Sequence, residues 1–497
     1  MRKKRKETLL NIASNLFLQL VTILSGFIIP RLIISTFGSE TNGLISSITQ
    51  FLNYITLLEG GITGVVMTSL YKPIVNKNKE KINQIYCTAQ GFFKRISFIF
   101  ILYTLILSIA YPLLFNTHFS FLYIFTLTWI LSVGLLIQYM FSLSIKILLN
   151  ADKKIYVTSL TQAFIIILNL LATIIVVKVF PNIHLLKIIS GTLFIIQPII
   201  FEYYSRKHYK LKKTQKDVRL IAKRWDGFAV NLAYFIHFST DITILTIFTD
   251  LKTVSIYSVY SLVTNGMRQI IQSITNSINP VIGQAYATGK DEVINKKLDT
   301  YEYIVSMTVC IFFSVVILLI TPFVVIYTSG VSDADYNQPL FGVLLAISEA
   351  VYLLRMPHLH LAYAANKYRE ITPAAFIEAA INIIISVLLV NKIGLTGVAI
   401  GTLAAMIYRL IYHINLTTVL LKNRSKRKTY YRLSLFILTS LIGILLCYLH
   451  LNMNCSIDII NLIIYSIIYV IFLSILFLIM SRLFFKKEIE EIKKYIK

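Results

Sequence analysis

The chain is poor in cysteine, and its few cysteines form no pattern. Its 497 residues include four of them, Cys87, Cys310, Cys447 and Cys455. No two of the four have the C-x-x-C spacing or another spacing of metal ligands, so we expect neither a structural disulfide nor a metal site. We expect all four to act as small apolar side chains.

Acidic residues are scarce as well. The chain has 23 of them against 48 lysines and arginines, which gives a net charge of +25, and 56% of its residues are hydrophobic. The mean hydropathy is +0.72. A water-soluble core cannot hide so many apolar side chains at this length, so lipid must be the solvent. No basic patch belongs to a separate folded domain, so nucleic acid is not an expected partner.

The N-terminal segment lacks the cleavage site of a signal peptide. Its basic start, MRKKRK, is followed by an apolar run from about Leu9 to Ile34. This run is too long for the apolar core of a signal peptide, and no small-x-small site follows it. We expect it to be a retained first membrane span.

Long apolar runs are what the sequence has in abundance. A helix needs roughly 20 apolar residues to cross the hydrocarbon, and the sequence predicts fourteen such spans. The predicted fold is therefore an all-α integral membrane protein with about fourteen transmembrane helices. The spans are 8–34, 42–71, 92–114, 120–146, 155–178, 185–205, 224–248, 253–286, 303–328, 337–364, 371–391, 395–421, 431–450 and 458–484.

Most of the basic residues separate these runs. Forty of the 48 lie in eight clusters, at 2–6, 72–95, 146–154, 206–224, 290–297, 367–369, 422–432 and 482–497. With fourteen spans, all eight clusters fall on one side of the membrane, and cytoplasmic loops are the ones that carry excess lysine and arginine. The sequence thus predicts a multi-pass protein of the bacterial cytoplasmic (inner) membrane with both termini cytoplasmic.

The sequence also repeats itself at a nearly constant spacing. Residues 148–153 match 362–367, 189–193 match 400–403, and 80–83 match 292–295. Spans 1–6 therefore correspond to spans 7–12, which predicts two six-helix lobes related by a pseudo-twofold axis along the membrane normal, plus two C-terminal helices.

These boundaries predict four parts. They are an N-lobe at 1–205, a basic cytoplasmic linker at 206–223, a C-lobe at 224–421, and a final pair of helices with a tail at 422–497. The linker carries the densest positive charge. We expect it to lie on anionic membrane lipids, although direct capture of an anionic substrate stays open.

Eight ionisable residues are the candidates for buried charges inside the predicted spans, where each costs about 2.5–3.5 kcal/mol on insertion scales. One interpretation is that they form structural ion pairs. The other is a hydrated cationic cavity in which guanidinium groups bind a phosphate-bearing ligand and a carboxylate carries a coupling ion. The arginines are Arg31, Arg268, Arg355 and Arg409, and the acids are Glu59, Asp241, Glu349 and Glu378.

The N-terminal stretch 30–43, PRLIISTFGSETNG, places an arginine before a Phe-Gly-x-x-x-x-Gly turn. Together with the 6+6+2 arrangement of spans, it resembles Wzx-type polysaccharide flippases of the multidrug/oligosaccharidyl-lipid/polysaccharide (MOP) exporter superfamily. The resemblance covers the whole chain. The second repeat departs from it, because it has Phe248-Thr249-Asp250 in place of the glycine turn.

The resemblance implies a transporter and not an enzyme. Its substrate would be an undecaprenyl-diphosphate-linked oligosaccharide, moved to the outer leaflet by alternating access for capsule, O-antigen or exopolysaccharide assembly. It implies diphosphate contacts for Arg31 and Arg268 first, then for Arg355 and Arg409. It also implies a groove for the polyprenyl tail beside the last two spans, no cofactor beyond H+ or Na+ as coupling ion, and the polysaccharide polymerase machinery as a candidate partner.

Three other functions stay open. A peptidoglycan lipid-precursor flippase shares the superfamily, and so does a multidrug/cation antiporter, although antiporters typically have twelve spans and favour acids over arginines in their cavity. A membrane glycosyltransferase or polymerase usually has a substantial outer loop. The outer connections between the predicted spans are all short, which argues against that class.

Overall fold

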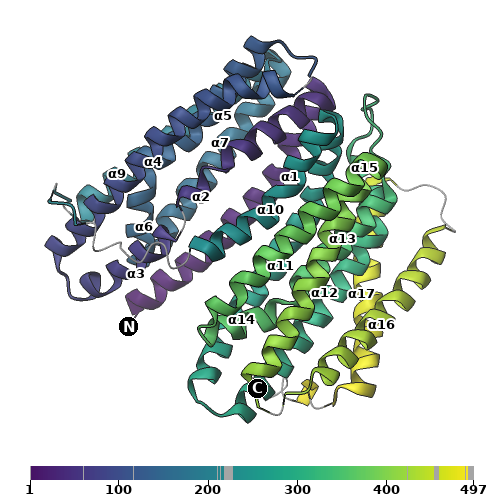
Figure 1. Cartoon of the computed structure of the whole chain (residues 1–497). Coiled ribbons are helices and arrows are strands. Elements are labelled where there is room, and N and C mark those ends of the chain that lie inside the picture. The colour runs from purple at the N-terminus through teal and green to yellow at the C-terminus, as the bar shows by residue number, and fades with distance from the viewer. Residues whose placement is uncertain are drawn as a thin grey trace. The chain divides into compact units, whose positions relative to one another are not determined.

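The computed structural model describes residues 2–490 except 60, 116, 210, 213, 218–227, 423, 453–457 and 487. All regular elements in this part of the chain are helices, which confirms the predicted all-α fold (Figure 1). They form two compact units, Met1–Phe235 and Ile236–Lys497.

The helices are α1 (Arg2–Asn53), α2 (Thr56–Glu59), α3 (Ile62–Val75), α4 (Lys79–Leu114), α5 (Phe121–Ile137), the π-helix η1 (Gln138–Ser142), α6 (Leu143–Ala151), α7 (Ile155–Val179), α8 (Ile183–Thr192), the 3-10 turn η2 (Leu193–Ile195), α9 (Ile196–Tyr209), α10 (Phe228–Phe248), α11 (Leu251–Ala287), α12 (Asp291–Tyr327), α13 (Pro339–Leu354), α14 (Met356–Ala364), α15 (Tyr368–Leu420), α16 (Lys426–Asn452) and α17 (Ile459–Phe484).

Ten helical segments of the described chain are long and apolar enough to cross a membrane. Tyr368–Leu420 holds two of the predicted spans, and Glu7–Glu59 holds the first span and the first part of the second, which α3 continues. The predicted seventh span is α10, in which the described apolar segment Ser239–Phe248 is shorter than the ten. The eighth is α11, which is long but carries polar residues at its centre, including Arg268. The fourteen predicted spans and the ten apolar segments are therefore consistent.

Two glycines mark where a predicted pair of spans meets without a loop. The backbone of α1 leaves the helical region at Gly38 (φ 86°, ψ 167°), and that of α15 leaves it at Ile393 and Gly394 (φ 55°, ψ −131° at Gly394). Residues with a Cβ rarely adopt such positive φ angles, whereas glycine does so at little cost. Each glycine thus ends one helix and starts the next within the same long segment.

The two units share a turn at corresponding positions, one residue out of register with the sequence match of 148–153 to 362–367. Lys153 (φ 61°) follows α6 and Asn366 (φ 55°) follows α14, both in the left-handed conformation that ends many helices. The same hydrogen bonds close both turns: Lys154 N–H donates to Leu149 O at 2.8 Å, and Lys367 N–H donates to Ala362 O at 2.9 Å. The helices before the turns, α6 and α14, have the same length and begin at equivalent positions.

In the first unit, α1 packs along α7, and α5 packs between α4 and α8. The start of α7 is held by a side chain of α1. Asn11 Oδ1 accepts from Tyr156 N–H at 2.9 Å, and Asn11 Nδ2 donates to Lys153 O at 2.8 Å. Of the predicted linker 206–223, the first four residues extend α9, and residues 210, 213 and 218–223 lie outside the described part.

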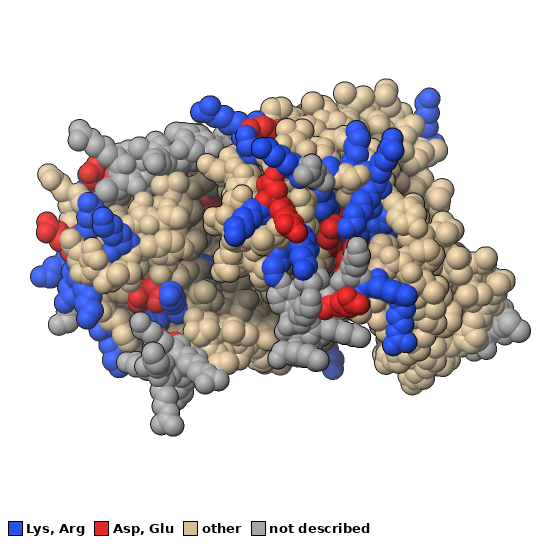
Figure 2. Space-filling view, turned by 90° about the horizontal axis from the view of Figure 1, so that it is seen from below, with Lys and Arg blue, Asp and Glu red and all other residues tan. Residues whose placement is uncertain are grey.

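Acidic side chains lie among the basic ones on the face that Figure 2 shows. Lys154 contacts Glu7 at 2.9 Å in the first unit, and Lys367 contacts Glu370 at 2.7 Å in the second. Some of the lysines and arginines in the predicted cytoplasmic clusters therefore have acidic partners.

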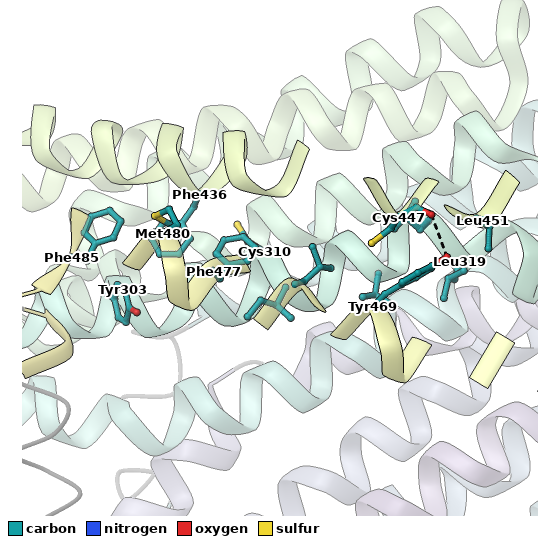
Figure 3. Packing of buried hydrophobic residues seen from close by; sticks show 14 residues of the cluster. Tyr303, Cys310, Leu319, Phe436, Cys447, Leu451, Tyr469, Phe477, Met480 and Phe485 are labelled. Carbon is teal, nitrogen blue, oxygen red and sulfur yellow. Dashed lines mark hydrogen bonds between the residues drawn. The ribbon is translucent and has the colours of Figure 1, made fainter. Parts of the chain in front are cut away.

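In the second unit, α12 lies at the centre and contacts α11, α13, α16 and α17. In the most apolar stretch of α12, 61% of the residues are buried. In the most apolar stretches of α16 and α17, 22% are buried. The contact between α12 and the last two helices is aromatic. Phe436 stacks on Phe477 and Phe485 with ring centroids 5.5 Å apart in both cases, and Tyr303 of α12 lies 5.9 Å from Phe436 (Figure 3).

The cysteines Cys87, Cys310 and Cys447 are buried and free of disulfides. Cys310 and Cys447 belong to the apolar cluster between α12, α16 and α17 (Figure 3). Their expected role as apolar side chains is confirmed at these two positions. Cys455 lies outside the described residues.

Candidate functional site

The eight predicted site residues divide between the two units. Arg31 and Glu59 belong to the first unit. The other six belong to the second: Asp241, Arg268, Glu349, Arg355, Glu378 and Arg409. The structure brings most of these six together, and the contacts between them define the candidate site.

Arg268 and Glu349 form the first ion pair. Arg268 lies in the middle of α11 and Glu349 on α13, and these helices pack against one another. The distance from Arg268 Nη1 to Glu349 Oε1 is 2.8 Å, and each side chain is 14% exposed. This pair is therefore partly accessible.

Glu378 forms the second, more deeply buried group. One of its oxygens, Oε2, lies 3.4 Å from Arg355 Nη1 and 3.0 Å from Arg409 Nη1. Arg355 sits at the break between α13 and α14, whereas Glu378 and Arg409 come from the two halves of α15. The three side chains are only 5–8% exposed.

Tyr352 links the two groups. The guanidinium carbon of Arg355 lies 4.5 Å from the centroid of its ring, and that of Arg268 lies 5.9 Å away. Cations within about 6 Å of an aromatic face are attracted to it. The hydroxyl of Tyr352 also accepts a hydrogen bond from Gln272 Nε2 at 3.2 Å. The result is one network of three guanidinium groups and two carboxylates, and the carboxylate of Asp241 lies close enough to Glu349 to interact with it electrostatically.

Several polar atoms of this network are buried without a hydrogen-bond partner in the part of the chain that the structure describes. They are Glu349 Oε2, Arg355 Nε and Arg409 Nε. Buried polar atoms are nearly always hydrogen-bonded, so each exception calls for an explanation such as water or a ligand. The arginines and acids thus form the ion pairs that the sequence allowed. Some of their polar atoms stay free to form hydrogen bonds with water or a ligand.

Asp241 on α10 has a different environment. Its carboxylate accepts hydrogen bonds from Thr402 Oγ1 at 2.9 Å, Tyr257 OH at 3.0 Å and Asn382 Nδ2 at 3.2 Å. Ser386 donates to Asn382 Oδ1 at 2.9 Å. Within the described residues no basic side chain pairs with Asp241, so the pairing with a buried arginine that the sequence allowed does not occur here.

In the first unit, Glu59 accepts hydrogen bonds from Thr63 Oγ1 and, at 3.4 Å, from Tyr139 OH. Lys146 of α6 lies close enough to interact electrostatically with Glu59. The sequence pattern placed Lys146 in a cytoplasmic cluster, but it lies inside a helix directly after the π-helix η1. Arg31 is half-buried on α1.

A second ionic cluster, which the sequence did not predict as a site, lies where α12 and α16 begin. Arg424 contacts Glu302 at 2.5 Å and Asp299 at 2.9 Å. Arg432 contacts Glu302 at 2.7 Å, Asp299 at 3.0 Å and Glu488 at 3.1 Å, and its side chain is 1% exposed. Both arginines belong to the predicted cytoplasmic cluster 422–432. The basic residues of these clusters were expected only to determine how the chain is oriented in the membrane.

Burial alone would lower the pKa of the Arg424 guanidinium, but the carboxylates of Glu302 and Asp299 outweigh this effect and raise the pKa above its ordinary value. Arg424 therefore stays charged. A signal for this cluster was present in the sequence: Asp299 and Glu302 share one helix face, as do Lys428 and Arg432. A cavity of about 380 Å³ beside the cluster is lined by three acids and three bases, so its charge is balanced.

No family model and no curated protein matches the sequence. Solved structures do match the fold. One is described as "Lipid II flippase MurJ, inward closed conformation"; it has 17% sequence identity and a TM-score of 0.72, and the match covers 97% of this chain and 100% of that one.

MATE transporters match as well. An inward-facing multidrug resistance MATE family transporter of the MOP superfamily has 14% identity and a TM-score of 0.67, with 82% of this chain and 96% of that one covered. A eukaryotic MATE transporter has 14% identity and a TM-score of 0.57, with 86% and 100% covered. At these identities the likeness shows the fold, and it does not separate the Wzx type from its relatives. The chain is thus a multi-pass membrane protein with the fold that the Lipid II flippase shares with MATE transporters of the MOP superfamily.

Proposed function

We propose that the chain is a flippase that moves undecaprenyl-diphosphate-linked oligosaccharide units across the cytoplasmic membrane by alternating access, for capsule, O-antigen or exopolysaccharide assembly. The observation that carries the proposal is the network in the second unit, in which Arg268, Arg355 and Arg409 gather around the carboxylates of Glu349 and Glu378. A diphosphate is an anion that lipid cannot solvate, so its carrier must supply the opposite charge inside the membrane. Guanidinium suits this task because it stays charged and binds two phosphate oxygens at once.

A second candidate is a flippase for a peptidoglycan lipid precursor. The match with the Lipid II flippase supports it, because it covers nearly the whole of both chains. The diphosphate chemistry proposed for the arginine network is the same in both cases. The two candidates therefore differ in the sugar, about which the network carries no information.

A multidrug/cation antiporter is less well supported. The MATE structures cover a smaller share of this chain, and a site built around three guanidinium groups is a poor ligand set for a cationic drug. The buried cluster around Asp241 still fits one property of antiporters, which is coupling to a cation.

We assign the coupling ion, H+ or Na+, to Asp241. Its carboxylate has no basic partner among the described residues, and the hydroxyl oxygens of Thr402 and Tyr257 lie beside it, while Asn382 turns its Nδ2 toward it. Carboxylate, hydroxyl and amide oxygens are the ligands that hard cations prefer. A proton on the carboxylate would neutralise the same buried charge.

The test is a flipping assay in proteoliposomes. Purified protein is reconstituted with an undecaprenyl diphosphate that carries a fluorescent sugar, and the fluorophore in the outer leaflet is quenched with a membrane-impermeant reductant. We expect Arg268→Ala and Arg409→Ala to lower the flipping rate roughly tenfold or more, since each variant loses a charged hydrogen bond to the diphosphate, which contributes about 1.5–3 kcal/mol. Arg206→Ala is the matched control, because Arg206 is 77% exposed and pairs with its neighbour Glu202 on the same helix.

Wild-type rates in both variants, at normal expression, would reject the arginine network as the diphosphate site. Complementation separates the two lipid-linked substrates. Restored surface polysaccharide in a strain without its own polysaccharide flippase supports the first candidate, and rescue of a strain depleted of its peptidoglycan-precursor flippase supports the second.

A further inference from the structure

Glu349 holds Arg268 with only one of its two oxygens. The contact from Oε1 to Arg268 Nη1 is 2.8 Å, while Oε2 is buried and has no hydrogen-bond partner among the residues that the structure describes. An arginine and a carboxylate bind most strongly when two parallel N–H···O bonds form. The Arg268–Glu349 pair therefore uses part of the binding capacity of both groups.

This pair is also the accessible end of the network. Arg268 and Glu349 are each 14% exposed, whereas Arg355 and Glu378 are each 5% exposed. Glu378 compensates two arginines with one oxygen, so its displacement would leave two buried cations without a partner. An incoming anion reaches Arg268 more easily, and the carboxylate that it displaces there forms an ion pair with one arginine among the described residues instead of two.

Tyr352 keeps Arg268 in place during such an exchange. Its ring lies against the guanidinium groups of Arg268 and Arg355, and Gln272 fixes its hydroxyl. Arg268 thus has a neutral contact that does not depend on Glu349. The guanidinium stays near its position when the carboxylate moves away.

We propose that Glu349 is an internal competitor for Arg268 and makes the anion site selective for diphosphates over the monoanionic phosphodiesters of membrane lipids. The inference rests on the proposed function, since it concerns the selectivity of the same site. A phospholipid phosphodiester carries one negative charge, as the carboxylate does, so exchanging one for the other gains no charge. The carboxylate is tethered beside Arg268 and wins that competition. A diphosphate brings more negative charge and can bind both terminal nitrogens of the guanidinium.

Selectivity of this kind matters for a carrier that works in a bilayer. Anionic phospholipids surround the protein in great excess over any diphosphate-linked precursor, and an uncovered guanidinium would bind them. Specific sites commonly combine attraction to the right ligand with an element that disfavours the wrong one. Glu349 is the disfavouring element here.

The experiment compares binding of a fluorescent undecaprenyl diphosphate to protein in two kinds of vesicle. One contains only the zwitterionic lipid phosphatidylcholine, and the other contains increasing fractions of phosphatidylglycerol. The variants are Glu349→Gln, which keeps the shape and removes the charge, and Glu349→Asp, which keeps the charge. Glu292→Gln is the matched control, because Glu292 is an exposed acid at the start of α12 in the same unit.

In phosphatidylcholine we expect Glu349→Gln to bind the diphosphate as tightly as the wild type or more tightly. With phosphatidylglycerol present, its affinity should fall roughly tenfold further than that of the wild type, a difference of about 1.4 kcal/mol. Glu292→Gln should behave as the wild type, and Glu349→Asp, which keeps the competing charge, should lose less affinity than Glu349→Gln when phosphatidylglycerol is added.

Two results would overturn the proposal. If phosphatidylglycerol weakens binding equally in Glu349→Gln and in the wild type, Glu349 does not compete. If Glu349→Gln loses binding in pure phosphatidylcholine while Glu349→Asp retains it, Glu349 positions Arg268 instead. A wild-type protein that fails to bind the diphosphate in phosphatidylcholine would contradict the proposed function itself.

Discussion

Replacing Arg432 with alanine should destabilise the second unit by about 3 kcal/mol, the lower end of the range for a broken buried ion pair. Its guanidinium is buried and contacts Glu302, Asp299 and Glu488 at 2.7–3.1 Å. Removing one partner of a buried ion pair costs about 3–5 kcal/mol, because the remaining charge stays buried and unpaired. Arg424 still contacts Asp299 and Glu302 in the variant, so we expect the smaller loss.

The free energy of unfolding can be measured by titrating the purified protein in mixed micelles with a denaturing detergent and following helicity by circular dichroism. Lys428→Ala is the matched control. Lys428 contacts Asp299 and Glu488 as Arg432 does, but its side chain is 52% exposed. Exposed ion pairs contribute up to about 1 kcal/mol, so the control should lose at most that much.

Equal losses in Arg432→Ala and Lys428→Ala would refute the reasoning, because burial would then not distinguish the two cations. A further variant tests the cause. Adding Glu488→Gln to Arg432→Ala removes the charge of the one carboxylate in the cluster that Arg424 does not contact, and part of the lost stability should return. If the double variant is less stable than Arg432→Ala alone, the unpaired charge is not the source of the loss.

The remaining predictions concern the ion site and two glycines. Asp241→Asn should abolish the dependence of flipping on an ion gradient but leave diphosphate binding in phosphatidylcholine vesicles unchanged; a gradient effect that survives would remove Asp241 from coupling. Gly401→Ala should cost about 1–3 kcal/mol in the same titration, because its Cβ would overlap Ser386 Oγ and lie 2.9 Å from Ser386 N. Gly64→Ala, with nothing within 4 Å of the added Cβ, is its control, and equal losses would contradict the predicted clash. Gly38→Ala should lower the free energy of unfolding by about 1–3 kcal/mol, because φ is 86° there. An unchanged midpoint of the detergent titration would contradict this prediction, since α1 would then accommodate alanine at its kink without strain.

The fold could be predicted from the sequence because lipid imposes a simple pattern on the chain. Apolar runs of about 20 residues and basic clusters between them indicated the spans, and the repeat indicated two halves. The same pattern could not show that Gly38 and Gly394 join successive spans without a loop. A helix that continues on both sides of a single strained residue leaves almost no mark on composition.

The candidate site was predictable in part. Arg268, Arg355 and Arg409 were recognised because each lies far from any predicted loop, and the structure places all three in one network. Their partners could not be assigned, since Arg268 and Glu349 are far apart in the sequence and meet only through the packing of α11 on α13. Arg432 was missed for a different reason, because a basic cluster at a helix end predicts orientation and carries no information about burial.

The helix break near the middle of each unit bears on the origin of the chain. In the first unit the break is the π-helix that ends at Ser142, and in the second it is the interruption at Arg355, the equivalent position of the repeat. An irregularity of the backbone that recurs with the turn that follows it indicates descent from one ancestral half that was duplicated. Serine occupies the break in one copy and a buried arginine occupies it in the other. The bend is therefore common to the two copies, whereas the buried arginine at the bend belongs to the second copy alone.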